Sequence, residues 1–288
     1  LQAGIPAGVL QHVHMTHALT ADAVRDARVN AVAFTGSVEG GKAISQAAAG
    51  RFISVGYELG GKDAAYVCED TDVAKAAANV VDGAMYNAGQ SCCAVERVYV
   101  HERVMEAFLE AAVAEARALH LGDPREAGTN LGPLVRPRNA EVVRAQVQQA
   151  LGMGARALVG GSTGGRLPQY VSPEILVNVS HQMDLMTAET FGPVVGVMPV
   201  ASDEEAVARI NDSAFGLTAS LWTPDLARAQ RLGAQLDVGT VFMNRCDYLD
   251  PELAWVGVRD SGRGVTLSRF GFDGFTRLKS LHLRHAIP

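Results

Sequence analysis

The first sixty residues alternate between strand-like and helix-like patterns, and this alternation constrains the fold more than any other feature of the chain. Short apolar runs predict strands, and apolar residues at helical spacing predict helices, the first of them capped by Thr20. The predicted strands span 9–14, 31–34 and 53–57, and the predicted helices span 20–29 and 38–49. Because strands joined through helices run parallel, the chain is expected to begin with a parallel sheet.

The same patterns continue to the end of the chain, so the predicted fold class is α/β throughout. Further helices are predicted at 70–87, 102–119 and 137–151. Another is predicted to begin at a capping box formed by Ser202 and Glu205 and to end at 211, and a last one to begin at Thr223. Further strands are predicted at 97–101, 157–159, 175–179, 191–200, 218–222 and 238–244, with an edge strand at 279–284. A glycine-rich loop is expected at 160–165.

Composition restricts the class of protein. A length of 288 residues favours two domains, and 48% hydrophobic with 19% charged residues is typical of a globular protein. A net charge of −6 argues against nucleic-acid binding, and no apolar run is long enough to cross a bilayer. The four cysteines form no C-x-x-C pair, which argues against a disulfide framework or a zinc site and favours the cytoplasm.

Two adjacent cysteines stand in a loop of small residues at 87–93, between a predicted helix and a predicted strand. A thiol in such a loop is accessible to a substrate, and backbone N–H groups can favour its thiolate. Burial of Cys92 and Cys93 as small hydrophobic residues is the more common outcome for this pattern alone.

Two carboxylates stand beside predicted strands. Glu58 follows an apolar strand and precedes two glycines, a position that suits a general base. Glu189 precedes a buried strand and is followed by a Gly-Pro turn. For each of them an exposed side chain at a strand end is the simpler alternative.

In combination these segments are much more specific. The segments GSVEGG at 36–41, ELGGK at 58–62, GQSC at 89–92 and ETFGP at 189–193, followed by Asn244, resemble the NAD(P)-dependent aldehyde dehydrogenase superfamily. The resemblance covers essentially the whole chain. The dinucleotide-binding pattern G-x-G-x-x-G is absent.

The resemblance implies oxidation of an aldehyde to a carboxylic acid, with NAD or NADP as the hydride acceptor. By motif match Cys92 is the nucleophile that forms a thiohemiacetal and then a thioester, and Cys93 is a bystander. Glu58 matches the general base that activates water for hydrolysis. Its presence argues against the alternative of a CoA-acylating dehydrogenase.

The resemblance also implies the cofactor contacts. Glu189 matches the residue that hydrogen-bonds the nicotinamide ribose, and Phe191 matches the one that packs on the nicotinamide ring. The pyrophosphate is expected at the turn and helix start formed by Gly36, Ser37 and Gly41, where N–H groups favour an anion. Leu59 is expected to lie beside the cofactor through its backbone.

The segment LAWVGVRDSGRG at 253–264 departs from the pattern P-F-G-G-x-K-x-S-G-x-G-R-E found in many members. Trp255 stands where an aromatic wall of the substrate pocket is expected, and 246–250 would form the loop above it. Trp255 and Leu249 together favour a bulky, apolar aldehyde.

The resemblance predicts an aldehyde dehydrogenase-like organisation in three parts. Residues 1–60 are expected to form a partial Rossmann-type NAD(P)-binding domain, 61–258 the catalytic α/β domain, and 259–288 a return segment with an oligomerisation strand. Homodimers or homotetramers are expected through 280–284. The chain begins with Leu, in the middle of a pattern, so we expect a C-terminal portion whose N-terminal part is missing. A truncated, non-catalytic fragment is therefore an alternative.

Overall fold

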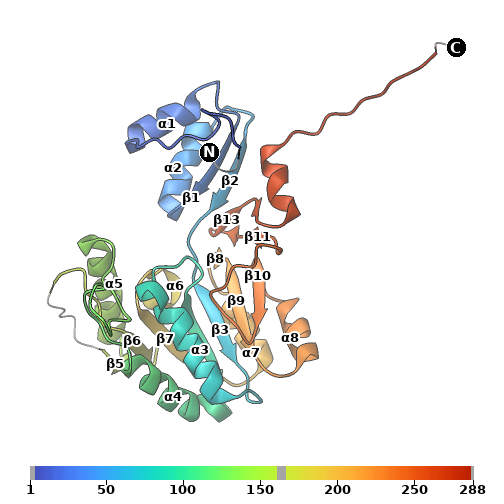
Figure 1. Ribbon diagram of the computed structural model, residues 1–288. Coiled ribbons are helices and arrows are strands. Elements are labelled where there is room, and N and C mark those ends of the chain that lie inside the picture. Colours follow the sequence, from blue (N-terminus) through green and yellow to red (C-terminus); the bar gives the residue numbers. More distant parts are fainter. Residues whose placement is uncertain (1–3, 161–166, 287–288) are drawn as a thin grey trace.

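The structure is a computed structural model that describes residues 4–160 and 167–286. It contains two main sheets, a small one near the amino terminus and a large one below it in Figure 1. Most of the loop predicted at 160–165 lies outside the described residues. The prediction of an α/β fold is confirmed. None of the described helices combines the length and the hydropathy needed to cross a membrane.

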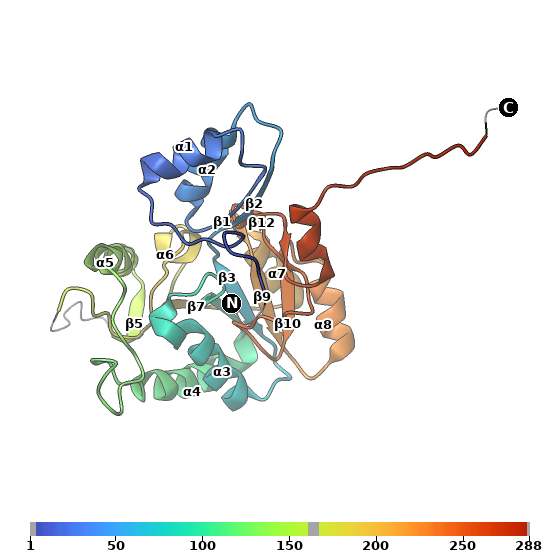
Figure 2. The ribbon, with the colours of Figure 1, turned by 45° about the horizontal axis from the view of Figure 1, so that its top comes forward.

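The small sheet consists of three strands. Strands β1 (Ala31–Thr35) and β2 (Ser54–Glu58) pair in parallel, and β13 (Gly262–Arg263) returns from the far end of the chain to pair antiparallel with β2. Helices α1 (His17–Arg25) and α2 (Val38–Ala48) pack together on this sheet, as Figures 1 and 2 show. The β1–α2–β2 unit is therefore the predicted parallel crossover.

The large sheet has the strand order β10-β9-β3-β4-β7-β6-β5. Its neighbours pair in parallel except for β5 and β6, which are antiparallel. The bounds in chain order are β3 (Asp63–Val67), β4 (Val95–His101), β5 (Arg156–Val159), β6 (Glu174–Val177), β7 (Val194–Val200), β9 (Thr218–Trp222) and β10 (Thr240–Met243). Small two-stranded pairs join β8 (Phe215–Gly216) to β12 (Val258–Arg259) and β11 (Trp255–Val256) to β14 (Val265–Thr266).

Helices cover both faces of this large sheet (Figure 1). They are α3 (Val73–Met85), α4 (Met105–Arg117), α5 (Pro137–Gly152), α6 (Asp184–Thr187), α7 (Asp203–Asn211) and α8 (Leu226–Gly233), with 3-10 turns η1 (Tyr86–Gly89), η2 (Glu102–Val104) and η3 (Arg269–Phe275). Every residue of β3, β4 and β9 is buried. Continuous burial is typical of a parallel sheet with helices on both sides.

Several predicted boundaries are wrong at the amino terminus. Residues 9–14 form no strand, and Val9, Leu10 and Val13 are exposed because no described strand lies beside the free edge of β1. Helix α1 begins at His17 because the Thr16 hydroxyl, and not that of Thr20, accepts the N–H group of Leu19 in the first turn.

Two further predictions differ from the structure near the end of the chain. Helix α8 begins at Leu226, where Asp225 provides the cap, and not at Thr223. The predicted edge strand at 279–284 is not formed, and Figure 1 shows this segment running extended away from both sheets. A strand requires a hydrogen-bonded neighbour, and the described part of the chain places none beside it.

The chain crosses from the small sheet to the large one in only four residues, 59–62, between β2 and β3. The carboxyl ends of β1 and β2 therefore face the amino ends of β3, β4 and β7. Loops at those strand ends meet in the space between the two sheets.

Candidate active site

An open cleft of about 590 Å³ lies where the two sheets face each other. The small sheet, the crossing segment, the loop before β4, helix α5 and the segment before β7 all contribute side chains. The lining residues are Thr35, Gly36, Ser37, Glu58, Leu59, Gly60, Cys92, Asn139, Val142, Glu189, Thr190 and Phe191.

Most of the site residues predicted from the sequence lie in this one cleft. Those that line it are Gly36, Ser37, Glu58, Leu59, Cys92, Glu189 and Phe191. Gly41 lies on the neighbouring side of α2, where a methyl group on it would collide with Leu59. Trp255 is buried in a different cavity, and Leu249 is exposed on its loop.

The loop that carries Cys92 starts with three successive residues of left-handed backbone, Asn87, Ala88 and Gly89, which end helix α3 abruptly. A side chain at Gly89 would collide with the carbonyl group of Gly192, so this loop packs directly on the segment before β7. The Gln90 carboxamide accepts a hydrogen bond from the Val135 N–H (2.8 Å) and donates one to the Asn87 carbonyl (3.0 Å). The loop is thus fixed from both sides.

Cys92 is partly buried at the inner end of the cleft, and its sulfur is influenced by several neighbours. A hydrogen bond from the Cys93 thiol lowers the pKa of Cys92, because it stabilises the thiolate. Burial and the carboxylates of Glu58, Glu189 and Asp247 act in the opposite direction. The lowered pKa favours a nucleophilic thiolate at Cys92.

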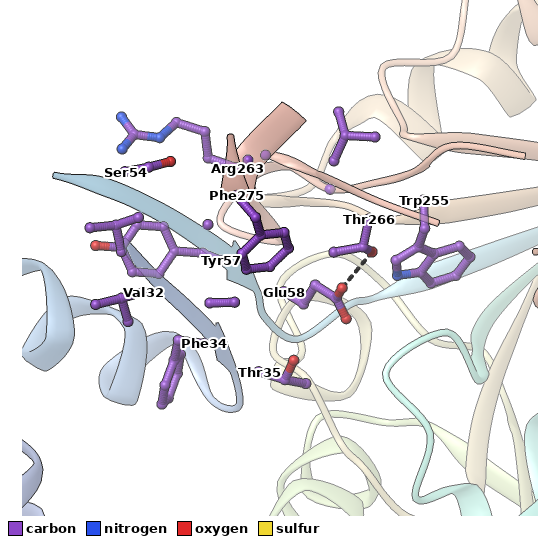
Figure 3. A pocket seen from close by; sticks show the side chains of 17 residues that line it. Val32, Phe34, Thr35, Ser54, Tyr57, Glu58, Trp255, Arg263, Thr266 and Phe275 are labelled. Carbon is purple, nitrogen blue, oxygen red and sulfur yellow. Dashed lines mark hydrogen bonds between the residues drawn. The ribbon is translucent and has the colours of Figure 1, made fainter. Parts of the chain in front are cut away.

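Glu58 lies at the end of β2 and borders two cavities, the cleft and a smaller cavity of about 100 Å³ behind it. Figure 3 shows the Glu58 carboxylate pointing toward Thr266, whose hydroxyl donates a hydrogen bond to it (2.5 Å), with the Trp255 ring beyond. The β13 strand pairs with β2 at Glu58, so the return segment holds both the backbone and the side chain of this residue.

The two glycines after Glu58 are required by close approaches. A side chain at Gly60 would collide with the Glu189 carboxylate, and one at Gly61 would collide with the Cys92 carbonyl. The Gly61 N–H donates a hydrogen bond to Glu189 (3.2 Å). Burial and the neighbouring Glu96 raise the pKa of Glu189 to about 7, although the Gly61 bond and Lys62 oppose that shift.

A buried ion pair stands directly beneath the cleft. The Lys62 ammonium lies 2.6 Å from the Glu96 carboxylate, and the two side chains are 0% and 3% exposed. Lys62 also donates to the Thr190 hydroxyl (2.9 Å). The Glu96 carboxylate accepts hydrogen bonds from the backbone N–H groups of Thr190 and Phe191, and the shortest distance to each nitrogen is 2.8 Å. Burial lowers the pKa of Lys62, and the attraction of Glu96 opposes this. One network therefore joins the crossing segment, β4 and the segment before β7.

The turn that precedes α2 forms the other wall of the cleft. The Ser37 hydroxyl caps the helix by accepting the Gly40 N–H (3.1 Å), and the Gly36 N–H donates to the Glu58 carbonyl (3.0 Å). The first N–H groups of a helix have no partner within it, so this end of α2 offers donors and a positive dipole to an anion.

A family model described as the aldehyde dehydrogenase family matches residues 1–281. The chain belongs to the aldehyde dehydrogenase family. The resemblance seen in the motifs is thereby confirmed. Because the match extends over nearly the whole chain, both sheets and the cleft between them lie within the family's domain.

Individual aldehyde dehydrogenases support the same conclusion. The chain is 37% identical to a betaine aldehyde dehydrogenase of Cereibacter sphaeroides and 37% identical to a succinate semialdehyde dehydrogenase (NAD(P)+) of Escherichia coli, over 98% and 97% of its length. It covers 59% and 60% of those two proteins. The solved NAD-dependent aldehyde dehydrogenase from Sinorhizobium meliloti superposes with a TM-score of 0.95 and 33% identity, over 100% of this chain and 57% of that one. The chain thus spans about three fifths of the length of these aldehyde dehydrogenases.

Several residues that shape this aldehyde dehydrogenase cleft were not singled out from the sequence. Thr266 and Asp247 contact Glu58 and Cys93 from 208 and 154 residues away in the chain. Lys62 stands within the ELGGK motif at 58–62, and the sequence around Glu96 gives it the appearance of an ordinary strand residue. The sequence offers one signal for them. Two adjacent charged residues stand at the start of each of two otherwise apolar strands, at Lys62–Asp63 and at Glu96–Arg97.

Proposed function

We propose that the protein oxidises an aldehyde to a carboxylic acid with NAD or NADP, using Cys92 as the nucleophile and Glu58 as the general base. The observation that carries this proposal is the shared cleft: a thiol with a lowered pKa, a carboxylate and the amino end of a helix line one cavity of a chain in the aldehyde dehydrogenase family. No other group of predicted residues in the described chain meets in this way.

The cleft has features that fit a dinucleotide. The start of α2, which follows Gly36 and Ser37, provides the free N–H groups of its first turn and the Ser37 hydroxyl for the pyrophosphate. The Glu189 carboxylate provides an acceptor for ribose hydroxyls, and Phe191 provides an apolar surface for the nicotinamide, both held by the network around Glu96. Leu59 lines the same cleft. When bound there, the nicotinamide supplies the acceptor for the hydride that leaves the substrate carbon.

The residues of the chain perform the covalent steps. The Cys92 thiolate attacks the aldehyde carbon and forms a thiohemiacetal, whose loss of hydride leaves a thioester on the same sulfur. Glu58 takes a proton from water as the water attacks the thioester carbon, the C–S bond breaks, and the acid leaves with Cys92 regenerated. Glu58 borders both the cleft and the smaller cavity, which leaves room for a water molecule beside its carboxylate.

A panel of aldehydes assayed with NAD and with NADP tests this function. Betaine aldehyde and succinate semialdehyde belong in the panel because relatives are named for them, and bulky apolar aldehydes belong there because of Trp255 and Leu249. We expect stoichiometric formation of reduced cofactor and carboxylic acid. Formation of an acyl-CoA, with no acid in the absence of CoA, would instead establish the acylating reaction.

Substitution of Glu58 with Gln separates the two halves of the reaction. We expect the steady-state rate to fall by about 10²- to 10⁴-fold, the usual contribution of a general base. The first turnover, measured as a burst of reduced cofactor in stopped flow, should remain because thioester formation precedes the step that needs the base. Glu110→Gln on the exposed surface of α4, outside the cleft, is the matched control and should change neither phase. An undiminished steady-state rate in Glu58→Gln would assign the base to another residue.

Cofactor affinity is expected to depend on pH through Glu189. With a pKa of about 7, this carboxyl is mostly protonated near about pH 6 and mostly ionised near about pH 8. The ionised form accepts ribose hydroxyls more strongly, so binding of NAD(P) should tighten by roughly fivefold as the pH rises across that interval. Calorimetric titration at the two pH values measures the change. Glu189→Gln should abolish the dependence, and a slope that survives this substitution would contradict the assignment.

The organisation of the protein is part of the proposal. We assign 1–60 to the partial NAD(P)-binding domain, 61–258 to the catalytic domain and 259–288 to the return and oligomerisation segment. The exposed apolar side chains Leu278, Leu281 and Leu283 on an extended segment suit pairing with a second copy, in a homodimer or homotetramer. Sedimentation as a monomer at micromolar concentration would count against this. The four unpaired cysteines suit the cytoplasm.

A further inference from the structure

Asp247 lies beside the proposed nucleophile but outside the cleft lining, and it contacts residues on both sides of Cys92. Its Oδ1 atom accepts a hydrogen bond from the Ser91 hydroxyl (2.9 Å) and another from the Cys93 thiol (2.9 Å). The Ser91 oxygen and the Cys93 sulfur are themselves 3.5 Å apart. One carboxylate oxygen thus holds the residue before Cys92 and the residue after it.

The loop that presents Asp247 is anchored independently of these bonds. Asn244, directly after β10, exchanges two hydrogen bonds with the backbone of Thr223 (3.0 and 2.8 Å). The Cys246 thiol donates to the Asn79 carbonyl on α3 (3.4 Å), and a side chain at Gly83 would collide with the Cys246 sulfur. The carboxylate is therefore positioned against the same helix that leads into the nucleophile loop.

Two adjacent thiols compete for one negative charge. A Cys93 thiol has a single proton, and both of its neighbouring acceptors, the Asp247 carboxylate and the Cys92 thiolate, require that the proton stay on Cys93. A Cys93 thiolate would instead stand 2.9 Å from a carboxylate, where like charges repel strongly.

We propose that Asp247 is a positioning residue that determines which of the two adjacent cysteines ionises: it keeps Cys93 as a protonated donor and leaves Cys92 as the thiolate. This proposal rests on the proposed function only in taking Cys92 as the nucleophile. In this arrangement Cys93 keeps a proton that it shares between the Asp247 carboxylate and the Cys92 thiolate, so it is a participant and not a bystander. The raised pKa of Cys93, caused by its bonds to Cys92 and Asp247 together with burial, agrees with the geometry.

The other charged groups near the pair do not make this selection. Glu58 at the end of β2, Glu189 before β7 and Asp63 at the start of β3 all interact with Cys92, and Glu58 and Glu189 disfavour its ionisation. These carboxylates would by themselves direct the charge away from Cys92. Asp247 also disfavours ionisation of Cys92, but its direct hydrogen bond from the Cys93 thiol opposes ionisation of Cys93 more strongly. Among the described residues, Asp247 is the carboxylate that hydrogen-bonds Cys93.

The test compares the titration of Cys93 with and without the Asp247 charge, followed by ultraviolet absorbance of the thiolate. In Cys92→Ser, Cys93 should remain protonated across the accessible alkaline range. In Cys92→Ser/Asp247→Asn, which keeps an acceptor oxygen, its midpoint should fall by at least about one pH unit. Asp250→Asn in the Cys92→Ser background removes a carboxylate from the same loop and should leave the midpoint unchanged. Identical Cys93 titrations with and without Asp247 would overturn the proposal.

A second measurement remains decisive if the Asp247 variant does not fold. The rate of alkylation of Cys92 by iodoacetamide, located by peptide mass spectrometry, reports its thiolate fraction as a function of pH. In Cys93→Ala the donor is lost, so the midpoint for Cys92 should rise by about half a unit or more, whereas Cys93→Ser should retain most of the wild-type value. An unchanged midpoint in Cys93→Ala would contradict the proposed role of the pair. Neither readout requires turnover, so a failure here is distinguishable from a failure of the proposed oxidation.

Discussion

Replacement of Cys92 with Ala is expected to lower aldehyde oxidation by at least about 10⁴-fold, because no covalent intermediate can form without the nucleophile. The rate is followed through the appearance of reduced cofactor, with both the burst and the steady state lost. Cofactor affinity should be nearly unchanged, since the residues expected to hold the dinucleotide lie elsewhere in the cleft.

The matched control for this substitution is Cys68→Ala. Cys68 is fully buried in the core at the end of β3, and burial raises the pKa of its thiol to about 12, so it takes no part in the cleft. Cys68→Ala should keep the wild-type rate. Cys93→Ala should keep measurable turnover with its pH profile displaced to higher pH. Substantial turnover in Cys92→Ala would show that another group attacks the substrate.

Breaking the buried Lys62–Glu96 pair is expected to have the largest effect on stability. Lys62→Met should lower the free energy of unfolding by about 3–5 kcal/mol, because Glu96 would remain buried without its counter-ion. The shift in the urea midpoint measures this loss. Lys75→Met, which breaks an exposed pair with Asp72, should cost less than about 1 kcal/mol.

A double variant distinguishes loss of charge balance from loss of packing. Glu96→Gln removes the charge and keeps an oxygen that can accept from Thr190 and Phe191. Lys62→Met/Glu96→Gln should therefore be less destabilised than the sum of the two single variants. Strict additivity would mean that the two side chains contribute independently, and the pair would then have no special role.

Much of the fold could be predicted from the sequence because its signals are local. The ends of β1, α2 and β9 follow from apolar spacing and from caps such as Ser37, and the prediction of each is within about one residue of the structure. Strand β3 was not among the predicted strands, although β4 and β9, which are just as completely buried, were predicted. Residues 9–14 were predicted wrongly because a local pattern does not reveal whether a neighbouring strand exists to pair with.

The candidate site shows the same difference between residues that local motifs mark and contacts between distant segments of the chain. Cys92, Glu58 and Glu189 stand in short motifs, and the resemblance of these motifs to the family could predict that the three residues share one site, although no local pattern joins them. The contacts of Thr266 with Glu58 and of Asp247 with Cys93 join segments more than 150 residues apart, and no spacing rule reaches that far. Trp255 was expected to form an aromatic wall of the substrate pocket. In the structure it is buried in a cluster with Cys93 and Leu217 and does not line the cleft.

The four-residue crossing between the sheets has a mechanical consequence. Its far end is locked, since Lys62 is tied to Glu96 and Thr190, while its near end carries Glu58 on the small sheet. The β13 strand of the return segment also pairs with β2 at Glu58, so the small sheet is joined to the large one by a second connection. Glu58 is therefore fixed by the crossing on one side and by the return segment on the other. The Gly36 N–H group donates to the Glu58 carbonyl, so a displacement of either connection would move the proposed base together with the start of α2.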